Sequence, residues 1–270
     1  MNTPTDAYTA DWDEQHRYKS VDGHDLRVYV VLSDGNAFPG PRPALVMFHG
    51  GGWNQGTPCQ FGPLSHALVK RGVTVFNVQY RLRNMHGSTP YDAVVDAFDA
   101  FRWIRGHADQ FNIDPDRIGA GGGSAGGHLA ACLATVSDRD LTGDDPPRPA
   151  SLVLFNPVYH TGPGSVGHAR LGDNWRSISP MHNLHAGMPP TLSMLGDSDQ
   201  LVPVSTGQAF RDQMNELGAR SELIVYKDQM HGFFNYGRGA TNQGEPGPMF
   251  IATCNNTIDF LSSLGWIVEP

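Results

Sequence analysis

The sequence predicts an α/β fold with a mostly parallel, doubly wound sheet and an antiparallel hairpin at its N-terminal end. Short apolar runs alternate with longer stretches of helical periodicity, as in folds whose strands are covered by helices on both faces. Near the N-terminus, two strand-like runs flank Asp22-Gly23, a dipeptide that favours tight hairpin turns. Ligands of such sheets bind at the carboxyl ends of the strands, so reactive residues are expected there.

Each element is predicted from its own pattern. The hairpin strands cover residues 17–21 and 26–31, on either side of the turn. The later strands are short apolar runs rich in β-branched residues, at residues 44–48, 73–78, 118–120, 152–155, 191–195 and 222–226. The helices between and after them cover residues 64–71, 91–107, 124–136, 204–217 and 248–264. Loops rich in Pro, Gly and Asp occupy residues 34–43 and 143–149.

The helix expected at residues 91–107 has two distinct sides. Apolar residues recur on one side with helical spacing: Val94, Phe98, Phe101 and Ile104. The other side carries three acidic residues: Asp92, Asp96 and Asp99. The helix is therefore expected to cover the sheet with its apolar stripe.

Length and charge narrow the class of protein. A chain of 270 residues suits a single α/β domain, so we expect one domain over residues 1–270, with a small pocket-forming insertion at about 159–190. The 19 basic and 27 acidic residues give a net charge of -8 without a basic run, which argues against a nucleic-acid partner. The N-terminal residues do not resemble a signal peptide, and no apolar run reaches about 18 residues. We therefore expect a cytoplasmic protein without a membrane partner.

A candidate nucleophile follows the strand at residues 118–120. Gly122, Ser124 and Gly126 fill the fixed places of a G-x-S-x-G motif, and a helical segment begins directly after them. The sharp turn between strand and helix strains the serine backbone and leaves no room for side chains two residues away. A phosphate-binding loop is the alternative, but the lysine of a P-loop is missing. The context therefore favours Ser124 as a nucleophile.

The strand at residues 44–48 ends in a second glycine-rich motif, His49-Gly50-Gly51-Gly52-Trp53. Consecutive glycines leave backbone N–H groups free to turn toward a bound oxygen. With the N–H of Ala125 next to the nucleophile, Gly51 and Gly52 are predicted to form an oxyanion hole. By itself such a segment is equally well explained as a structural loop.

A serine nucleophile needs a histidine that accepts its proton and a carboxylate that orients the histidine. In folds with this nucleophile turn, the acid precedes the histidine in the chain. His231 is the only histidine beyond residue 185 and follows the last expected strand, which favours it as the base. Asp197 and Asp199 both follow the strand at residues 191–195, and spacing alone leaves both open as the acid.

The chain resembles the hormone-sensitive-lipase-like and feruloyl or acetyl-xylan esterase-like branch of the α/β-hydrolases. The matching stretches are residues 49–53, 80–82, 101–104, 113–118, 123–130, 196–203 and 231–233. In the family pattern the acid falls on Asp199, and the base begins the H-G-F tripeptide at His231. Larger members carry a long helical cap at the N-terminus, whereas only about 43 residues precede the first central strand here. The resemblance therefore implies an α/β-hydrolase fold without a large lid.

Motifs and resemblance together predict a serine carboxylic ester hydrolase for short-chain acyl esters, with acetylated or feruloylated carbohydrates as candidate substrates. Two alternatives stay open. One is an amide hydrolase that resembles arylformamidase, and the other is a non-catalytic homologue that binds a small molecule. Trp53, Tyr159 and Phe233 are the expected substrate-binding residues, although Trp53 fits a packing role equally well. The expected partner is a small-molecule ester substrate. The sequence leaves open whether the protein forms a homodimer.

Metals, cofactors and disulfides are not expected. His182 and His185 have helical spacing but lie between prolines without an acidic ligand nearby, so a surface or packing role is favoured over a metal site. The three cysteines, Cys59, Cys132 and Cys254, are far apart and odd in number, so they do not indicate a disulfide framework.

Overall fold

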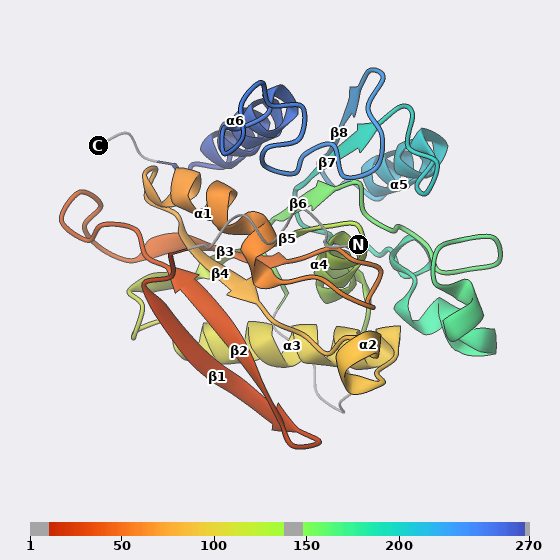
Figure 1. Ribbon diagram of the computed structural model, residues 1–270, viewed down its shortest axis with the longest axis horizontal. Helices are drawn as coiled ribbons and strands as arrows, with labels where there is room; N and C mark the ends of the chain where they lie inside the picture. The colour runs from red at the N-terminus through yellow and green to blue at the C-terminus, as the bar shows by residue number, and fades with distance from the viewer. Residues whose placement is uncertain (1–10, 138–147, 268–270) are drawn as a thin grey trace.

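The computed structural model describes residues 11–137 and 148–267, and its strands form one eight-stranded sheet (Figure 1). The strand order is β1-β2-β4-β3-β5-β6-β7-β8. The strands are β1 (Glu14–Val21), β2 (His24–Val31), β3 (Arg42–Phe48), β4 (Thr74–Val78), β5 (Ile113–Gly123), β6 (Leu152–Phe155), β7 (Thr191–Gly196) and β8 (Ser221–Tyr226). Only β1 with β2 and β2 with β4 pair antiparallel; the other neighbours are parallel. The predicted α/β-hydrolase architecture is therefore confirmed.

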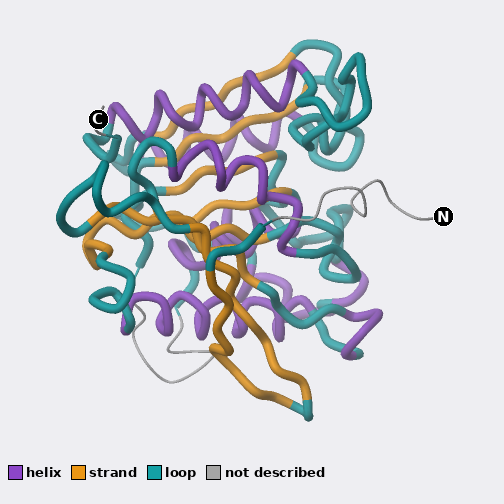
Figure 2. The backbone as a smooth tube through the Cα atoms, turned by 60° about the vertical axis from the view of Figure 1, so that its left-hand side comes forward, coloured by secondary structure: helices purple, strands orange, loops and turns teal. Residues whose placement is uncertain are grey.

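The N-terminal hairpin turns at Asp22 and Gly23. Both residues have positive φ, 51° and 77°, as a two-residue turn that matches the twist of a hairpin requires. Val21 is paired with His24 across the turn. The hairpin extends away from the rest of the sheet (Figure 2), and its prediction from the Asp-Gly dipeptide is confirmed.

Helices cover both faces of the sheet. They are α1 (Gly62–Val69), α2 (Arg83–His86), α3 (Pro90–Gly106), α4 (Ala125–Thr135), α5 (Val204–Glu216) and α6 (Pro248–Ser263). Side chains of β3 alternate between two cores: Ala44, Val46 and Phe48 pack with α3, α4 and α5, while Leu45 and Met47 pack with α1 and α6. Strands buried on both faces explain why the sequence shows continuous apolar runs there.

In helix α3 the predicted apolar stripe is buried, as expected, but one of the three aspartates predicted for its polar side is buried as well. Thr89 and Asp92 form a capping box at its start, which satisfies N–H groups of the first turn. Asp96, assigned to the polar side, is fully buried. Its carboxylate accepts hydrogen bonds from Lys19 Nζ at 2.7 Å and Arg81 Nε at 2.8 Å. Asp96 is buried because β1 packs over this side of α3, and Lys19 of β1 compensates its negative charge.

Several short helices are not predicted from the sequence. The four-residue α2 and the 3₁₀ helices η2 (Pro58–Phe61), η4 (His168–Arg170), η5 (Gly172–Ile178) and η6 (Pro180–His182) are too short for periodicity. Strand β5 begins at Ile113, five positions before the expected run, because polar residues occupy its first half. The loop expected at residues 143–149 lies largely outside the described residues.

Three of the 3₁₀ helices lie in the insertion expected at residues 159–190, which follows β6. Arg170 of this segment donates hydrogen bonds to Gly52 O at 2.9 Å and to Asn54 Oδ1 at 2.8 Å. The insertion is thereby tied to the glycine-rich loop after β3. Among the described residues, no helix is both long and apolar enough to cross a membrane.

Candidate active site

Ser124 occupies a strained turn between β5 and α4. Its φ of 53° and ψ of -116° lie in a region that non-glycine residues rarely adopt. The Ser124 N–H donates to Phe155 O at 2.9 Å, and its carbonyl accepts from His128 N at 3.0 Å. These bonds hold the side chain at the carboxyl end of the sheet, at the N-terminus of α4, where the helix dipole favours negative charge.

The glycines around Ser124 are required by close contacts. A Cβ on Gly126 would lie 2.0 Å from Phe48 O, and one on Gly122 would lie 2.5 Å from the same oxygen. A Cβ on Gly123 would lie 2.5 Å from Phe234 Cζ. The motif therefore reflects the packing of the turn against β3 and against the loop after His231.

The structure brings Ser124, His231 and Asp199 into one hydrogen-bonded chain. The distance from Ser124 Oγ to His231 Nε2 is 2.8 Å, and that from His231 Nδ1 to Asp199 Oδ2 is 2.7 Å. A carboxylate only accepts hydrogen bonds, so the proton lies on Nδ1 and Nε2 is free to accept from the serine. This arrangement can remove a proton from Ser124 as the oxygen attacks an electrophile.

The two aspartates left open by the sequence have different partners. Asp199 is buried, and its Oδ1 accepts from the N–H groups of Leu201 at 2.8 Å and Val202 at 3.0 Å. Burial alone would raise its pKa, but the hydrogen bonds from His231 and these amides outweigh burial, so the pKa of Asp199 lies below its ordinary value. Asp197 is exposed, and its Oδ1 accepts from Asp228 N at 2.6 Å. Only Asp199 contacts the histidine.

The loop after β3 lies against the nucleophile. A Cβ placed on Gly50 would lie 3.5 Å from Ser124 Cβ. The N–H groups of Gly51, Gly52 and Ala125 have no hydrogen-bond acceptor within the described residues, which leaves them available to a bound oxygen. The N–H of Gly50 is different, because it donates to the side chain of Gln60 at 2.6 Å.

His49 supports this loop as a neutral residue. Its ring is buried, stacks on Tyr80 with centroids 4.3 Å apart, and donates from Nδ1 to Gly50 O at 2.8 Å. Burial lowers the pKa of His49 to about 4, with the hydrogen bond to Gly50 opposing part of this shift. Tyr80 also donates its hydroxyl to His49 O at 2.8 Å. His49 therefore braces the glycines and, among the described residues, forms no hydrogen bond with Ser124.

The three aromatic residues expected to bind substrate are buried in the interior. Trp53 packs edge-on against His128, Tyr159 lies 4.7 Å from the ring of Phe210, and Phe233 lies against Phe234 and Tyr226. Each of the three is about 1% exposed. The structure does not bring their side chains to an open surface beside Ser124, because large apolar rings near the site fill the core beneath it.

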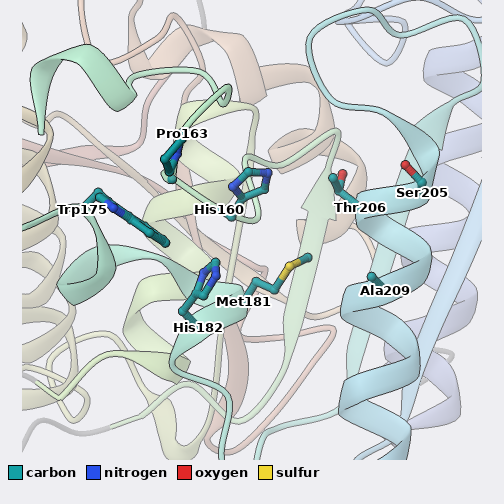
Figure 3. A pocket seen from close by; sticks show the side chains of 9 residues that line it. His160, Pro163, Trp175, Met181, His182, Ser205, Thr206 and Ala209 are labelled. Carbon is teal, nitrogen blue, oxygen red and sulfur yellow. The ribbon is translucent and has the colours of Figure 1, made fainter. Parts of the chain in front are cut away.

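Instead, the insertion and α5 line a cavity of about 390 Å³ that is open to the surface (Figure 3). It is lined by His160, Gly162, Pro163, Trp175, Met181, His182, Ser205, Thr206 and Ala209. The triad residues are not part of this lining. However, Val158 N donates to Ser124 O at 3.3 Å just before His160, and Ser205 follows the turn that holds Asp199. Both walls of the cavity thus continue segments that support the triad.

Both histidines of the cavity have a pKa below the ordinary value of a histidine, which favours their neutral form. Burial lowers the pKa of His160, and burial together with Arg176 and His160 lowers the pKa of His182. His185 points elsewhere and lies 3.0 Å from Ala134 O. Among the described residues, no group of three His, Cys, Asp or Glu side chains is placed to hold a metal ion.

Asn156 is a site residue that the sequence analysis missed. It directly follows β6, and its Oδ1 accepts from Gly232 N at 2.8 Å while its Nδ2 lies 3.4 Å from His231 Nε2. Its φ of 35° is held by a hydrogen bond from its N–H to Met194 O. Its place at the carboxyl end of a parallel strand was the available signal.

Several known proteins that this chain is similar to are esterases. Residues 34–148 match the BD-FAE family model, and residues 155–244 match the prolyl oligopeptidase family. Carboxylesterase NlhH of Mycobacterium tuberculosis is 38% identical over 224 residues, which cover 72% of this chain and 67% of NlhH. An acetylxylan esterase of Xylanibacter ruminicola is 29% identical over 210 residues, which cover 70% of this chain and 41% of the relative.

Among solved structures, esterase Est2 of Thermogutta terrifontis with bound propionate has a TM-score of 0.87 and 34% sequence identity. The match covers 95% of this chain and 96% of the Est2 chain. The same esterase is known in a form phosphonylated by sarin. In contrast, the chain spans about half the length of several curated relatives, from 41% to 58%.

Proposed function

This chain belongs to the hormone-sensitive-lipase-like carboxylesterases of the α/β-hydrolase superfamily, and on that premise we propose that it hydrolyses short-chain carboxylic esters through an acyl-enzyme on Ser124. The observation that carries the proposal is the contact of Ser124 Oγ with His231 Nε2 at 2.8 Å, in a chain that continues to Asp199. This contact favours a catalyst over a non-catalytic binding protein.

In the acylation step, Oγ of Ser124 attacks the ester carbonyl carbon while His231 Nε2 takes the hydroxyl proton. The carbonyl π electrons move to oxygen, and a tetrahedral intermediate forms. When it collapses, the bond to the alkoxy group breaks and His231 gives its proton to the departing alcohol. Asp199 stabilises the imidazolium between these two transfers.

Deacylation repeats the path with water. His231 takes a proton from water as the water oxygen attacks the acyl carbon of the ester on Ser124. Collapse of the second intermediate returns the proton to Oγ and releases the carboxylic acid. In both steps the N–H groups of Gly51, Gly52 and Ala125 are proposed to bind the oxyanion, and the loss of one such donor typically costs about 3 kcal/mol of transition-state stabilisation.

We propose short acyl groups as substrates because the aromatic residues expected to bind substrate offer no exposed apolar surface. Trp53, Tyr159 and Phe233 are buried, and the nearby cavity is lined partly by imidazoles and hydroxyls. Est2, at 34% identity, is known with bound propionate and with bound butyrate. The size of these two acids supports the same preference here.

For the alcohol, we propose the hydroxylated ring of an acetylated or feruloylated carbohydrate, held in the cavity of Figure 3. Ser205 and Thr206 offer hydroxyls, neutral His160 and His182 offer ring nitrogens, and Trp175 offers an aromatic surface. Uncharged polar groups beside an aromatic ring suit a polyhydroxylated ligand. The similarity to an acetylxylan esterase supports this substrate class.

The test of ester hydrolysis is Ser124→Ala assayed on p-nitrophenyl acetate, with Ser198→Ala as the control. Ser198 is an exposed serine in the turn before Asp199. We expect Ser124→Ala to abolish turnover with little change in thermal unfolding, because the hydroxyl contributes chemistry and little core volume. Activity of Ser124→Ala within about tenfold of wild type, a loss far smaller than that expected of a nucleophile, would overturn the proposal.

A further inference from the structure

Two amide side chains join the loop of the proposed oxyanion hole to the loop of the histidine. Gly50 N donates to Gln60 Oε1 at 2.6 Å, and Gln60 Nε2 donates to Asn235 Oδ1 at 2.8 Å. Asn235 Nδ2 then donates to Gly232 O at 2.9 Å. Gln60 lies in η2 and Asn235 lies 175 positions further along the chain, so this amide relay bridges distant segments.

We propose that Gln60 and Asn235 are positioning residues that fix the oxyanion loop relative to His231. The inference rests on the proposed function of the same site. Neither side chain forms a hydrogen bond with Ser124 among the described residues, so both act through the backbone groups that they hold.

The direction of the relay is fixed at both ends by the backbone. The N–H of Gly50 can only donate, so the oxygen of Gln60 must face it and the amide nitrogen of Gln60 must face Asn235. The carbonyl of Gly232 can only accept, so the nitrogen of Asn235 must face it. One assignment of the two amides satisfies all three bonds, and a residue that lacks a donor or an acceptor breaks it.

At the oxyanion end, the relay selects which N–H groups remain free. Gly50 is occupied by Gln60, whereas the N–H groups of Gly51 and Gly52 have no acceptor among the described residues. Gly50 also lies next to the nucleophile, since a Cβ at this position would lie 3.5 Å from Ser124 Cβ. A shift of its peptide would therefore move the two free donors relative to Ser124.

At the histidine end, the relay holds the residue that follows the base. The N–H of Gly232 donates to Asn156 Oδ1 at 2.8 Å, and its carbonyl accepts from Asn235. Arg238 also donates to His231 O, and the backbone N–H of Asn235 donates to Gly232 O at 3.2 Å. The turn that carries His231 is thus tied to β6 through Asn156, held by its own local bonds, and joined to the oxyanion loop through the side chain of Asn235. Because a misplacement of about 1 Å can cost about 100-fold in rate, such a link is expected to affect catalysis more than folding.

The test compares Gln60→Met with Gln79→Met. Methionine keeps the length of glutamine but removes its donor and acceptor. Gln79 is a matched control, because it is also half-buried and its Oε1 accepts from a backbone N–H, that of Arg27 at 3.3 Å, on the hairpin side of the sheet. We measure kcat/KM for p-nitrophenyl acetate, the rate of inactivation by a fluorophosphonate, and the urea midpoint of unfolding.

We expect Gln60→Met to lower both kcat/KM and the inactivation rate by about 10- to 100-fold, and Gln79→Met to change them by less than about twofold. The two urea midpoints should shift by similar small amounts. Asn235→Leu breaks the same relay from the other loop and should reproduce the rate loss. In the double variant Gln60→Met/Asn235→Leu, the loss should not exceed that of the larger single variant, because one link is removed either way.

Full activity of both single variants in a protein whose wild type hydrolyses the ester would overturn the relay and leave the proposed function intact. Rate losses that multiply in the double variant would also overturn it, because independent residues behave in that way. A wild type without ester hydrolysis would contradict the proposed function itself, which separates the two failures.

Discussion

His231 Nδ1 donates a hydrogen bond to Asp199 Oδ2 at 2.7 Å, whereas the Oδ1 atom of Asp197 accepts from Asp228 N instead. The second oxygen of Asp199 is held by two backbone N–H groups, so the carboxylate cannot rotate away without losing them. This contact fixes the imidazole tautomer whose Nε2 faces Ser124.

The acid is tested by two amide substitutions. Asp199→Asn should lower kcat by at least about 100-fold with the fold intact, because the amide disfavours the productive tautomer, and the same change costs about 10⁴ in a serine protease. Asp197→Asn should lose less than about tenfold and change the free energy of unfolding by no more than about 1 kcal/mol, as expected of an exposed turn. Steady-state kinetics and urea unfolding measure both, and an exchange of the two behaviours would refute the assignment of Asp199.

The acyl preference is tested with p-nitrophenyl esters from acetate to dodecanoate. Each buried methylene contributes about 0.8 kcal/mol where an apolar groove exists, so a lipase improves as the chain lengthens. We expect kcat/KM to peak at acetate to butyrate and to fall for longer chains, because the apolar rings near the site are already buried. A steady rise toward dodecanoate would contradict the short-chain proposal.

The glycine contacts are tested by Gly126→Ala against Gly106→Ala. A Cβ on Gly126 would lie 2.0 Å from Phe48 O, so the turn must shift and the free energy of unfolding should fall by about 1–3 kcal/mol or more, with loss of activity. A Cβ on Gly106, at the end of α3, meets nothing within 4 Å. This control should keep its activity. Equal thermal stability of the two variants would contradict the packing described for the nucleophile turn.

Two buried histidines predict a pH dependence of stability. Burial lowers the pKa of His49 and of His128 to about 4, with hydrogen bonds to Gly50 O and Ile178 O opposing part of each shift. Between pH 6.5 and about 4, the unfolded chain binds protons that the folded chain does not. The free energy of unfolding should therefore fall as pH falls through this window, by up to about 1.4 kcal/mol per pH unit for each histidine.

The contribution of one histidine is isolated by His128→Gln, whose amide can still donate to Ile178 O. Urea unfolding between pH 4.5 and 7.5 should show a shallower loss of stability in this variant than in wild type. Identical slopes in the two proteins would mean that His128 is not held neutral by burial.

Most of the fold could be predicted because its signals are local. Continuous β-branched runs marked the strands, and Asp22-Gly23 marked the hairpin turn. The buried position of Asp96 could not be predicted, since it depends on Lys19 and Arg81 arriving from other strands and loops. The first half of β5 carries no continuous apolar run, because Asp114, Asp116 and Arg117 follow Ile113 there.

The residues of the candidate site also fall into those that local sequence predicts and those that only the folded chain shows. Ser124 and His231 followed from the motif and from chain order, and the structure brings them to 2.8 Å. Spacing alone left two aspartates open, and only the family resemblance placed the acid on Asp199, because the direction of the turn after β7 is not encoded in spacing. In the structure Asp199 Oδ2 lies 2.7 Å from His231 Nδ1. Gln60 and Asn235 carry no motif, and only the folded chain brings two such distant residues together.

The central claim is that Ser124 is the nucleophile of an acyl-enzyme, and labelling by a fluorophosphonate tests it most directly. Est2, which is similar to this chain, is known phosphonylated by sarin. Intact mass spectrometry of the inactivated wild type should show one adduct per chain, peptide mapping should place it on Ser124, and Ser124→Ala should remain unlabelled. An adduct on any other residue, or full loss of activity without an adduct on Ser124, would contradict the account.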